Sequence, residues 1–203
     1  MDLAIIIITV LISILALYNR ELSGRMQFNA YAIRHHGEGW RFFTYGLIHA
    51  DWIHLGINMF VLYSFGRAVT DAYLYYFDTK GYLFYLLLYI GGIVFSVLFD
   101  YGKHKDDMYY NAVGASGAVS AVLFASILLD PASKIMLFPI PFPLPSVLFG
   151  VFYLVYSAVM AKRASDNIGH NAHFWGAVFG IAFTIAIKPM LAVYFWREIT
   201  GLF

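Results

Sequence analysis

Two polar side chains that could perform nucleophilic chemistry lie in apolar parts of this chain. Ser116 occurs in Gly114-Ala115-Ser116-Gly117, inside the uncharged run 108–129, and His173 lies in a second uncharged run, 167–187. A serine hydroxyl becomes a good nucleophile when a neutral imidazole accepts its proton. Neither run contains Asp or Glu, so the pair predicts a Ser-His dyad rather than a triad.

The same chemistry needs hydrogen-bond donors for the tetrahedral oxyanion. His54 and Asn58 are four residues apart, so on a helix they share one face and could both donate. Backbone N–H groups near Ser116 could add to them if Ser116 begins a helix. The alternative is that His54 and Asn58 simply tie two helices together.

Composition indicates that these residues belong to an integral membrane protein. The 203 residues are 61% hydrophobic and 12% charged, with a mean hydropathy of +0.70, whereas a soluble domain has about 45–50% apolar and 25% charged residues. A net charge of +1 argues against nucleic acid as a partner. The absence of cysteine excludes disulfides and thiolate metal sites. The length suits a single transmembrane domain over 1–203.

Six helices account for the apolar runs, which predicts an all-α polytopic membrane protein. The first run lacks a basic n-region and a cleavage site, so we expect a retained helix rather than a signal peptide. The polar segment 19–51 is long for a bare linker and should be structured. Prolines at alternate positions from Pro139 to Pro145 delay the fifth helix until Ser146. The expected helices are 1–18, 52–66, 81–99, 116–129, 146–161 and 167–187.

Glycines provide the means of bringing the dyad together. Gly176 and Gly180 form a small-xxx-small pattern on the helix of His173, and Gly117 offers a flat surface on the helix of Ser116. Such patterns allow two helices to approach closely in a membrane. We expect this approach to bring His173 within hydrogen-bond reach of Ser116.

Together these motifs resemble the rhomboid intramembrane serine proteases. The resemblance runs from Glu38 through Gly180, with the motifs in the family's order. Gly-x-Ser-Gly alone is weak support, but its combination with the histidine motifs is specific. The residues that carry the resemblance are Trp40, Arg41, His49, His54, Asn58, Gly114, Ser116, Gly117, His170, His173, Gly176 and Gly180.

The resemblance implies a six-helix rhomboid-like bundle with a long structured first loop. It implies Ser116 as nucleophile, His173 as base, and an oxyanion hole made by His54, Asn58 and the Ser116 N–H group. It also implies that no cofactor or metal is needed, and that the substrates are transmembrane segments of other membrane proteins, met in the lipid bilayer. Access would be gated by the fifth helix and its following loop, here 161–168.

The resemblance further implies a location and an orientation. A compact six-helix chain suggests a prokaryotic plasma (inner) membrane, with a water-filled active site opening to the non-cytoplasmic side. The positive-inside rule taken literally would put the arginine-containing first loop in the cytoplasm instead. Without that loop the basic residues are nearly balanced, so the charge pattern leaves the orientation open, as it does the oligomeric state.

One position departs from the family. Many members carry an aromatic residue four positions after the nucleophile, stacked on the catalytic imidazole, and here that position is Ser120. We therefore expect His173 to be held in another way, either by Ser120 or by an aromatic side chain from another turn.

Structural interpretations compete with these roles. Ser116 could be a small packing residue, and His173 could be a metal ligand beside other histidines, although no HExxH motif or nearby carboxylate supports this. For the supporting residues we favour structural roles. His49 and His170 are expected to be hydrogen bonders, Trp40 and Arg41 an interfacial anchor, and Glu38 the partner of a loop arginine.

Two other functions fit an apolar bundle. A derlin-type chaperone would bind membrane clients without cutting them, but such proteins normally lack the serine or the histidine. A small transporter would be expected to show internal repeats or paired broken helices, and the sequence shows neither.

Overall fold

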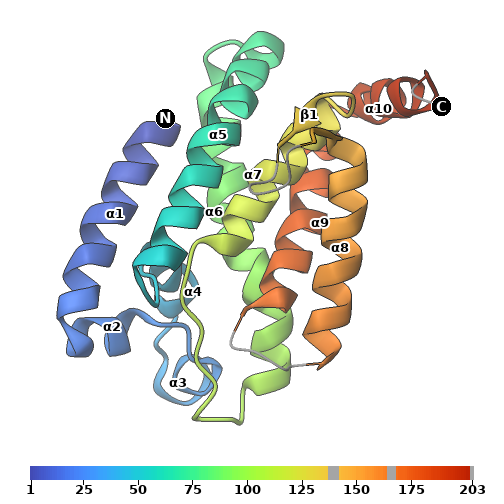
Figure 1. The fold of residues 1–203 in the computed structure, drawn as a ribbon. Helices are drawn as coiled ribbons and strands as arrows, with labels where there is room; N and C mark the ends of the chain where they lie inside the picture. Colours follow the sequence, from blue (N-terminus) through green and yellow to red (C-terminus); the bar gives the residue numbers. More distant parts are fainter. Residues whose placement is uncertain (137–141, 164–167, 202–203) are drawn as a thin grey trace.

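The computed structural model describes residues 1–136, 142–163 and 168–201, and these residues form a bundle of α-helices (Figure 1). The all-α prediction is confirmed. Two short elements, β1 (Lys134–Ile135) and β2 (Leu144–Pro145), pair as an unpredicted antiparallel hairpin. The bundle helices are α1 (Asp2–Tyr18), α5 (Trp52–Phe77), α6 (Lys80–His104), α7 (Ser116–Leu129), α8 (Ser146–Arg163) and α9 (His170–Ile187).

Helix α7 lies at the centre of the bundle, in contact with α5, α6 and α9 (Figure 1). Its 14 residues extend about 21 Å at 1.5 Å per residue, which is less than the 30 Å or so of a bilayer's hydrocarbon core. Eleven of the 14 residues are buried. Because α7 is short and enclosed, Ser116 at its first position lies within the bundle.

The candidate residues gather at one end of the bundle. Helices α5 and α9 begin at this end, where α1 finishes, and α7 begins further into the bundle with its first residue towards the same end (Figure 1). His54 and Asn58 lie in the first two turns of α5, and His173 lies in the first turn of α9. The long first loop covers the same end, so the sequence segments that carry the predicted chemistry converge there.

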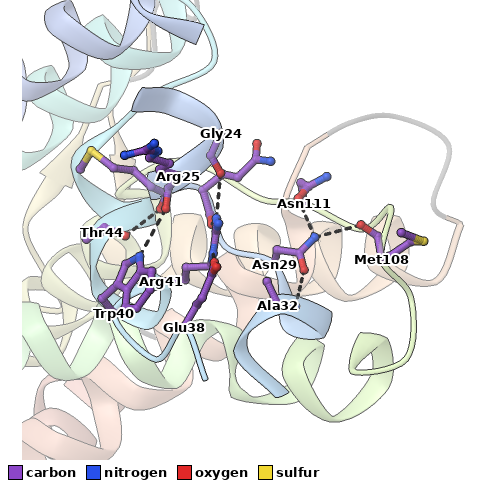
Figure 2. Close-up of polar contacts among 12 residues, drawn as sticks. Gly24, Arg25, Asn29, Ala32, Glu38, Trp40, Arg41, Thr44, Met108 and Asn111 are labelled. Atoms are coloured by element: carbon purple, nitrogen blue, oxygen red, sulfur yellow. Dashed lines mark hydrogen bonds and ion pairs between the residues drawn. The ribbon is translucent and has the colours of Figure 1, made fainter. Parts of the chain in front are cut away.

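That first loop is structured, as predicted. It contains α2 (Arg20–Met26), α3 (Ala30–His36), α4 (Arg41–Thr44) and a 3-10 turn, η1 (Tyr45–Leu47). Asn29 caps α3 by accepting from the Ala32 N–H at 2.7 Å. The Asn29 amide also donates to the Met108 carbonyl at 3.0 Å and to the Asn111 side chain at 2.9 Å (Figure 2). The loop is thereby tied to the segment that leads into α7.

Arg41 organises the other half of the loop. Its guanidinium donates to the Gly24 carbonyl at 2.8 Å and the Gln27 carbonyl at 2.7 Å, and it pairs with Glu38 at 2.5 Å (Figure 2). The expected pairing of Glu38 with a loop arginine is confirmed. Arg41 is only 8% exposed, so its interpretation as an interfacial anchor is wrong, whereas Trp40 is 53% exposed and suits that position.

Several helix boundaries differ from the prediction. Helix α5 continues to Phe77 instead of ending near Gly66, because Arg67 and Asp71 form an exposed ion pair one turn apart and the buried face continues past them. Helix α6 is also longer, and α9 begins at His170 rather than at 167. An additional helix, α10 (Met190–Gly201), follows α9. Residues 164–167 of the expected gating loop, and Pro139 and Pro141, lie outside the described residues.

Length and hydropathy support fewer membrane spans than the six predicted. Among the described residues, α6 and α8 are long and apolar enough to cross a bilayer. Helices α9 and α10 pass the same test only as a pair, which is bent by 116°. Helices α1 and α7 are apolar but shorter. The membrane character is therefore supported, and the six-span arrangement stays a prediction.

Candidate active site

The turn before α7 is shaped by Gly114. Its φ of +119° is a conformation that side chains rarely adopt. A Cβ at Gly114 would also lie 2.5 Å from Cε1 of His54. The His54 ring therefore lies directly against the backbone two residues before Ser116, so α5 and the start of α7 meet at this glycine.

The N-terminus of α7 has no side-chain cap. Ala115 occupies the N-cap position, and the Val119 N–H makes an intrahelical bond to the Ala115 carbonyl at 2.9 Å. The first N–H groups of a helix, here those of Ser116 and Gly117, have no intrahelical acceptor. They also lie at the positive end of the helix dipole. These groups can stabilise an oxyanion that forms beside Ser116.

Helices α7 and α9 meet along a glycine seam, which confirms the close approach predicted from the sequence. A Cβ on Gly176 would collide with the Gly117 carbonyl, and one on Gly180 would collide with the Ala121 carbonyl. A Cβ on Gly117 would lie 3.4 Å from the Ala172 carbonyl. Because Gly117 follows Ser116 and Ala172 precedes His173, the seam brings the two candidates onto adjoining turns of neighbouring helices.

An aromatic ring from α8 contacts the candidate base. The rings of Tyr153 and His173 stack with centroids 6.1 Å apart and an interplanar angle of 29°. The Tyr153 hydroxyl forms a 2.6 Å hydrogen bond with Ser120 Oγ. Of the two alternatives open at Ser120, the second is therefore observed, with the ring supplied by another helix. Tyr153 was not predicted, and the only sequence signal for it was the missing aromatic residue at position 120.

His54 and Asn58 lie on one face of α5, as their spacing predicted. Asn58 is 5% exposed, and its amide donates to the carbonyl of His54 at 2.9 Å. The backbone N–H of His54 donates to the Asp51 carboxylate at 2.8 Å, so Asp51 caps the N-terminus of α5. Since an amide nitrogen carries two hydrogens, Asn58 retains donor capacity beyond this bond. Donation from Asn58 or His54 to a substrate oxyanion stays a prediction.

His49 supports the His54 side of the site. The His49 Nε2 atom accepts from the Ala115 N–H at 3.4 Å, and its Nδ1 atom is 2.9 Å from Ser13 Oγ. Ser13 in turn donates to the Leu47 carbonyl at 2.9 Å. This chain of bonds requires a neutral imidazole with its proton on Nδ1. Burial, with a smaller contribution from His54, accordingly lowers the pKa of His49 to about 3.

The beginning of α9 is held by residues that the sequence reasoning missed. The Asn171 amide donates to Asp100, a buried carboxylate on α6 that also accepts from the Tyr110 hydroxyl at 3.0 Å. His170 is 4% exposed, and its ring meets that of His173 edge-on at 5.9 Å. His170 therefore packs beside the candidate base, and its expected role as a hydrogen bonder stays a prediction.

Solvent can reach the two dyad candidates in part. Ser116 and His173 are both intermediate in exposure.

Two grooves, of about 200 and 380 Å³, lie at the opposite end of the bundle beside Lys188 and Asp130. No cluster of three or more His, Cys, Asp or Glu side chains suited to a metal ion occurs in 1–136, 142–163 and 168–201.

Comparison with known proteins gives relatives of similar sequence. The chain is 28% identical over 149 residues to RHOMBOID-like protein 12, mitochondrial, of Arabidopsis thaliana, a match that covers 66% of this chain and 42% of that protein. It is 27% identical over 143 residues to the human presenilin-associated rhomboid-like protein, mitochondrial, covering 66% and 34%. It is 24% identical over 172 residues to the rhomboid protease AarA of Providencia stuartii, covering 78% and 59%.

These matches span only about a third to three fifths of each relative's length. Two of the three relatives are named as mitochondrial, so the comparison does not support the expected prokaryotic plasma membrane. A model of the Rhomboid domain matches residues 36–189, which include Glu38 and both dyad candidates. Since that match covers well over half of the 203 residues, the chain belongs to the rhomboid family.

Proposed function

We propose that this protein is an intramembrane serine endopeptidase that cuts transmembrane segments of other membrane proteins. The observation that carries the proposal is the glycine seam, in which Gly117 and Gly176 hold the uncapped start of α7 against α9. Ser116 is the nucleophile and His173 the general base. The relatives support the proposal at the level of the family, because one of them is named as a rhomboid protease.

The proposed reaction follows from these groups. His173 takes the proton of Ser116 Oγ as the oxygen attacks the scissile carbonyl. The N–H groups of Ser116 and Gly117, with Asn58 and His54, donate to the resulting oxyanion. His173 then protonates the leaving amine, and water hydrolyses the acyl-enzyme. General-base help is worth about 10²–10⁴-fold in rate, and each oxyanion donor about 10²–10³-fold.

The substrate must unwind before it can react. A carbonyl within a transmembrane helix is occupied by the hydrogen-bond ladder, and lipid disfavours freeing it. We propose that α1, α5, α6, α7, α8 and α9 cross the bilayer together, with the active-site end away from the cytoplasm. Because α7 is short, Ser116 then lies part of the way into the bundle. Water reaches Ser116 from the active-site end, and the unwound segment of the substrate meets Ser116 there.

A serine-directed probe tests the proposal. The detergent-solubilised protein is treated with a fluorophosphonate, alongside Ser116→Ala, His173→Ala and the matched control Ser126→Ala, which removes a hydroxyl from the same helix. Labelling should vanish in Ser116→Ala, fall about 10²-fold or more in His173→Ala, and persist in Ser126→Ala. Cleavage of a model transmembrane substrate should follow the same order.

Two results would contradict the proposal. Labelling that persists in both Ser116→Ala and His173→Ala would remove the dyad. Equal substrate cleavage by Ser116→Ala and the unmodified protein would remove the protease. Substrate binding without cleavage by the unmodified protein would favour a derlin-type client-binding role instead.

A further inference from the structure

The ring of the candidate base contacts the ring of a residue on a different helix. Resting on the proposed function, we infer that Tyr153 on α8 is a positioning residue for His173, and that Ser120 on α7 holds Tyr153 in place. Catalytic competence then requires α8 to be docked against α7 and α9. Tyr153 acts through His173 and does not touch the reacting atoms.

The stacking geometry suits a positioning role. At an interplanar angle of 29° and a centroid separation of 6.1 Å, the Tyr153 ring lies nearly parallel to the His173 imidazole and offset from it. Both imidazole nitrogens exchange protons in the plane of the ring, so a nearly parallel neighbouring ring restricts rotation of the imidazole without bonding to either nitrogen. His170 meets His173 at 79°, as an edge contact. Of these two ring contacts, only the Tyr153 one fixes the plane of the imidazole.

Tyr153 is itself held on several sides. Its hydroxyl bonds to Ser120 Oγ at 2.6 Å, and Ser120 is 2% exposed. Its ring also contacts Phe124 at 5.5 Å and Phe149 at 5.8 Å between centroids. Ser120 lies one turn after Ser116 on the same face of α7. The Ser120–Tyr153–His173 series therefore aligns the base with the helix that carries the nucleophile.

Helix α8 is the least enclosed of the helices around this site. Three of its 18 residues are buried, Ser146, Gly150 and Ser157, against eleven of 14 in α7. Its outer face exposes Phe152, which is 65% exposed, and Val155, which is 57% exposed. A helix with so few buried contacts is the one most easily displaced. A displacement of α8 withdraws the Tyr153 ring from His173 without moving the α7–α9 seam.

A first set of variants tests whether the ring matters. Tyr153→Leu removes the stacked ring, and kcat for a model transmembrane substrate should fall about 10–100-fold, because small misplacements of catalytic groups have effects of that size. KM should stay within about twofold. Tyr153→Phe and Ser120→Ala keep the ring but remove the hydrogen bond between Ser120 and Tyr153, so kcat should fall less in both variants than in Tyr153→Leu. Phe152→Leu, the neighbouring exposed aromatic, should change nothing.

A swap of the two positions is the decisive experiment. Ser120→Tyr alone should impair the enzyme, because Ser120 is buried and Tyr153 fills the adjacent space. Combined with Tyr153→Ala, the same substitution supplies a ring from α7 in the vacated space. The double variant should recover to within about tenfold of the unmodified kcat, well above either single variant. Because the two positions are in contact, refilling the space also restores packing without any stacking. Ser120→Leu combined with Tyr153→Ala is therefore the matched control, and it should recover stability but not kcat.

The outcomes separate this inference from the proposed function. If Ser116→Ala keeps full cleavage, the protease proposal fails. If Ser116→Ala is inactive while Tyr153→Leu keeps the unmodified kcat, the positioning role is overturned and the protease stands. Where Tyr153→Leu does not fold, Tyr153→Phe and the swap decide the matter. A folded double variant that stays as inactive as Tyr153→Ala overturns the inference.

Discussion

Helix α9 meets its two neighbours in different ways. Towards α7 it presents Gly176 and Gly180, and each lies so close to an α7 carbonyl that a methyl group would not fit. Towards α8 it presents His173, whose ring is 6.1 Å from that of Tyr153. The first contact joins two backbones, whereas the second joins two side-chain rings. The first contact therefore fixes the positions of Ser116 and His173 relative to each other. The second contact fixes the orientation of the His173 imidazole.

This difference has a physical basis. Close-packed backbone contacts leave no rotamers to adjust, so the two helices move as one body. Stacked rings can slide or separate by a few ångströms at small cost, because an aromatic pair contributes only about 0.5–1.5 kcal/mol beyond its burial. The seam is thus the constant part of the site, and the α8 contact is the adjustable part.

The largest expected effect comes from breaking the seam. Gly176→Leu should abolish labelling of Ser116 and strongly destabilise the bundle, because the new side chain meets the Gly117 carbonyl rather than a flexible side-chain end. Overpacking of a core costs about 1–3 kcal/mol even where neighbours can relax. Gly176→Ala should show the same trend to a smaller extent. Thermal unfolding in detergent measures the loss of stability, and fluorophosphonate labelling measures the loss of reactivity at Ser116.

A matched glycine provides the control for the seam. Gly56 lies in α5 near the same end of the bundle, and a Cβ there would meet nothing within 4 Å. Gly56→Ala should leave labelling unchanged and could only raise stability, by up to about 1 kcal/mol of helix propensity. Equal effects of Gly56→Ala and Gly176→Ala would show that the seam has no special role.

A pH experiment tests the fixed side of the site at His49. The folded-state pKa of His49 is lowered to about 3 from an ordinary 6.5, chiefly by burial, while nearby Asp51 opposes the shift. Between these two values the unfolded chain binds a proton that the folded chain does not. Stability should therefore be complete above about pH 6.5 and decrease as the pH falls towards 3. At about 1.4 kcal/mol per pH unit, the loss reaches about 3 kcal/mol at pH 4.

Variants isolate this contribution from the other titrating groups. His49→Gln should lower the unfolding temperature at pH 7 and flatten its dependence on pH between 4 and 7. Ser126→Ala, which changes no titratable group, should keep the slope of the unmodified protein. If His49→Gln and the unmodified protein show parallel pH curves, the neutral buried imidazole is not what couples stability to pH.

The sequence predicted the constant part of the site better than the adjustable part. The seam follows from the spacing of Gly176 and Gly180, because helical periodicity alone puts them on one face. Tyr153 could not be found in this way, since it reaches His173 from a different helix and no spacing rule relates the two. Ser120 marked the position as unusual without naming the replacement.

Boundaries and loop residues show the same limit. Arg67 suggested the end of a span, yet α5 continues because that side chain is exposed beside Asp71. Residue type alone predicts one role, an interfacial anchor, for both Trp40 and Arg41. Adjacent residues at the start of α4 point in different directions, however. One is 53% exposed and the other 8%. Residue type and period predict which face is apolar, whereas burial of a single polar group depends on partners distant in sequence.

The smallest expected effect concerns what holds the beginning of α9. Asp100→Ala leaves the Asn171 amide and the Tyr110 hydroxyl without their shared acceptor. Both groups are only partly buried, so each loss costs no more than the low end of the about 1–3 kcal/mol of a buried unsatisfied group. If the seam alone positioned His173, this variant would lose stability yet keep the labelling rate of Ser116. We expect a several-fold loss of labelling as well, because Asn171 lies two residues before the base.

Asp106→Ala is the control, since Asp106 is exposed and pairs with Arg34 at 2.8 Å, a contact worth at most about 1 kcal/mol. Equal labelling rates in the two variants would assign the positioning of α9 to the glycine seam and Tyr153 alone.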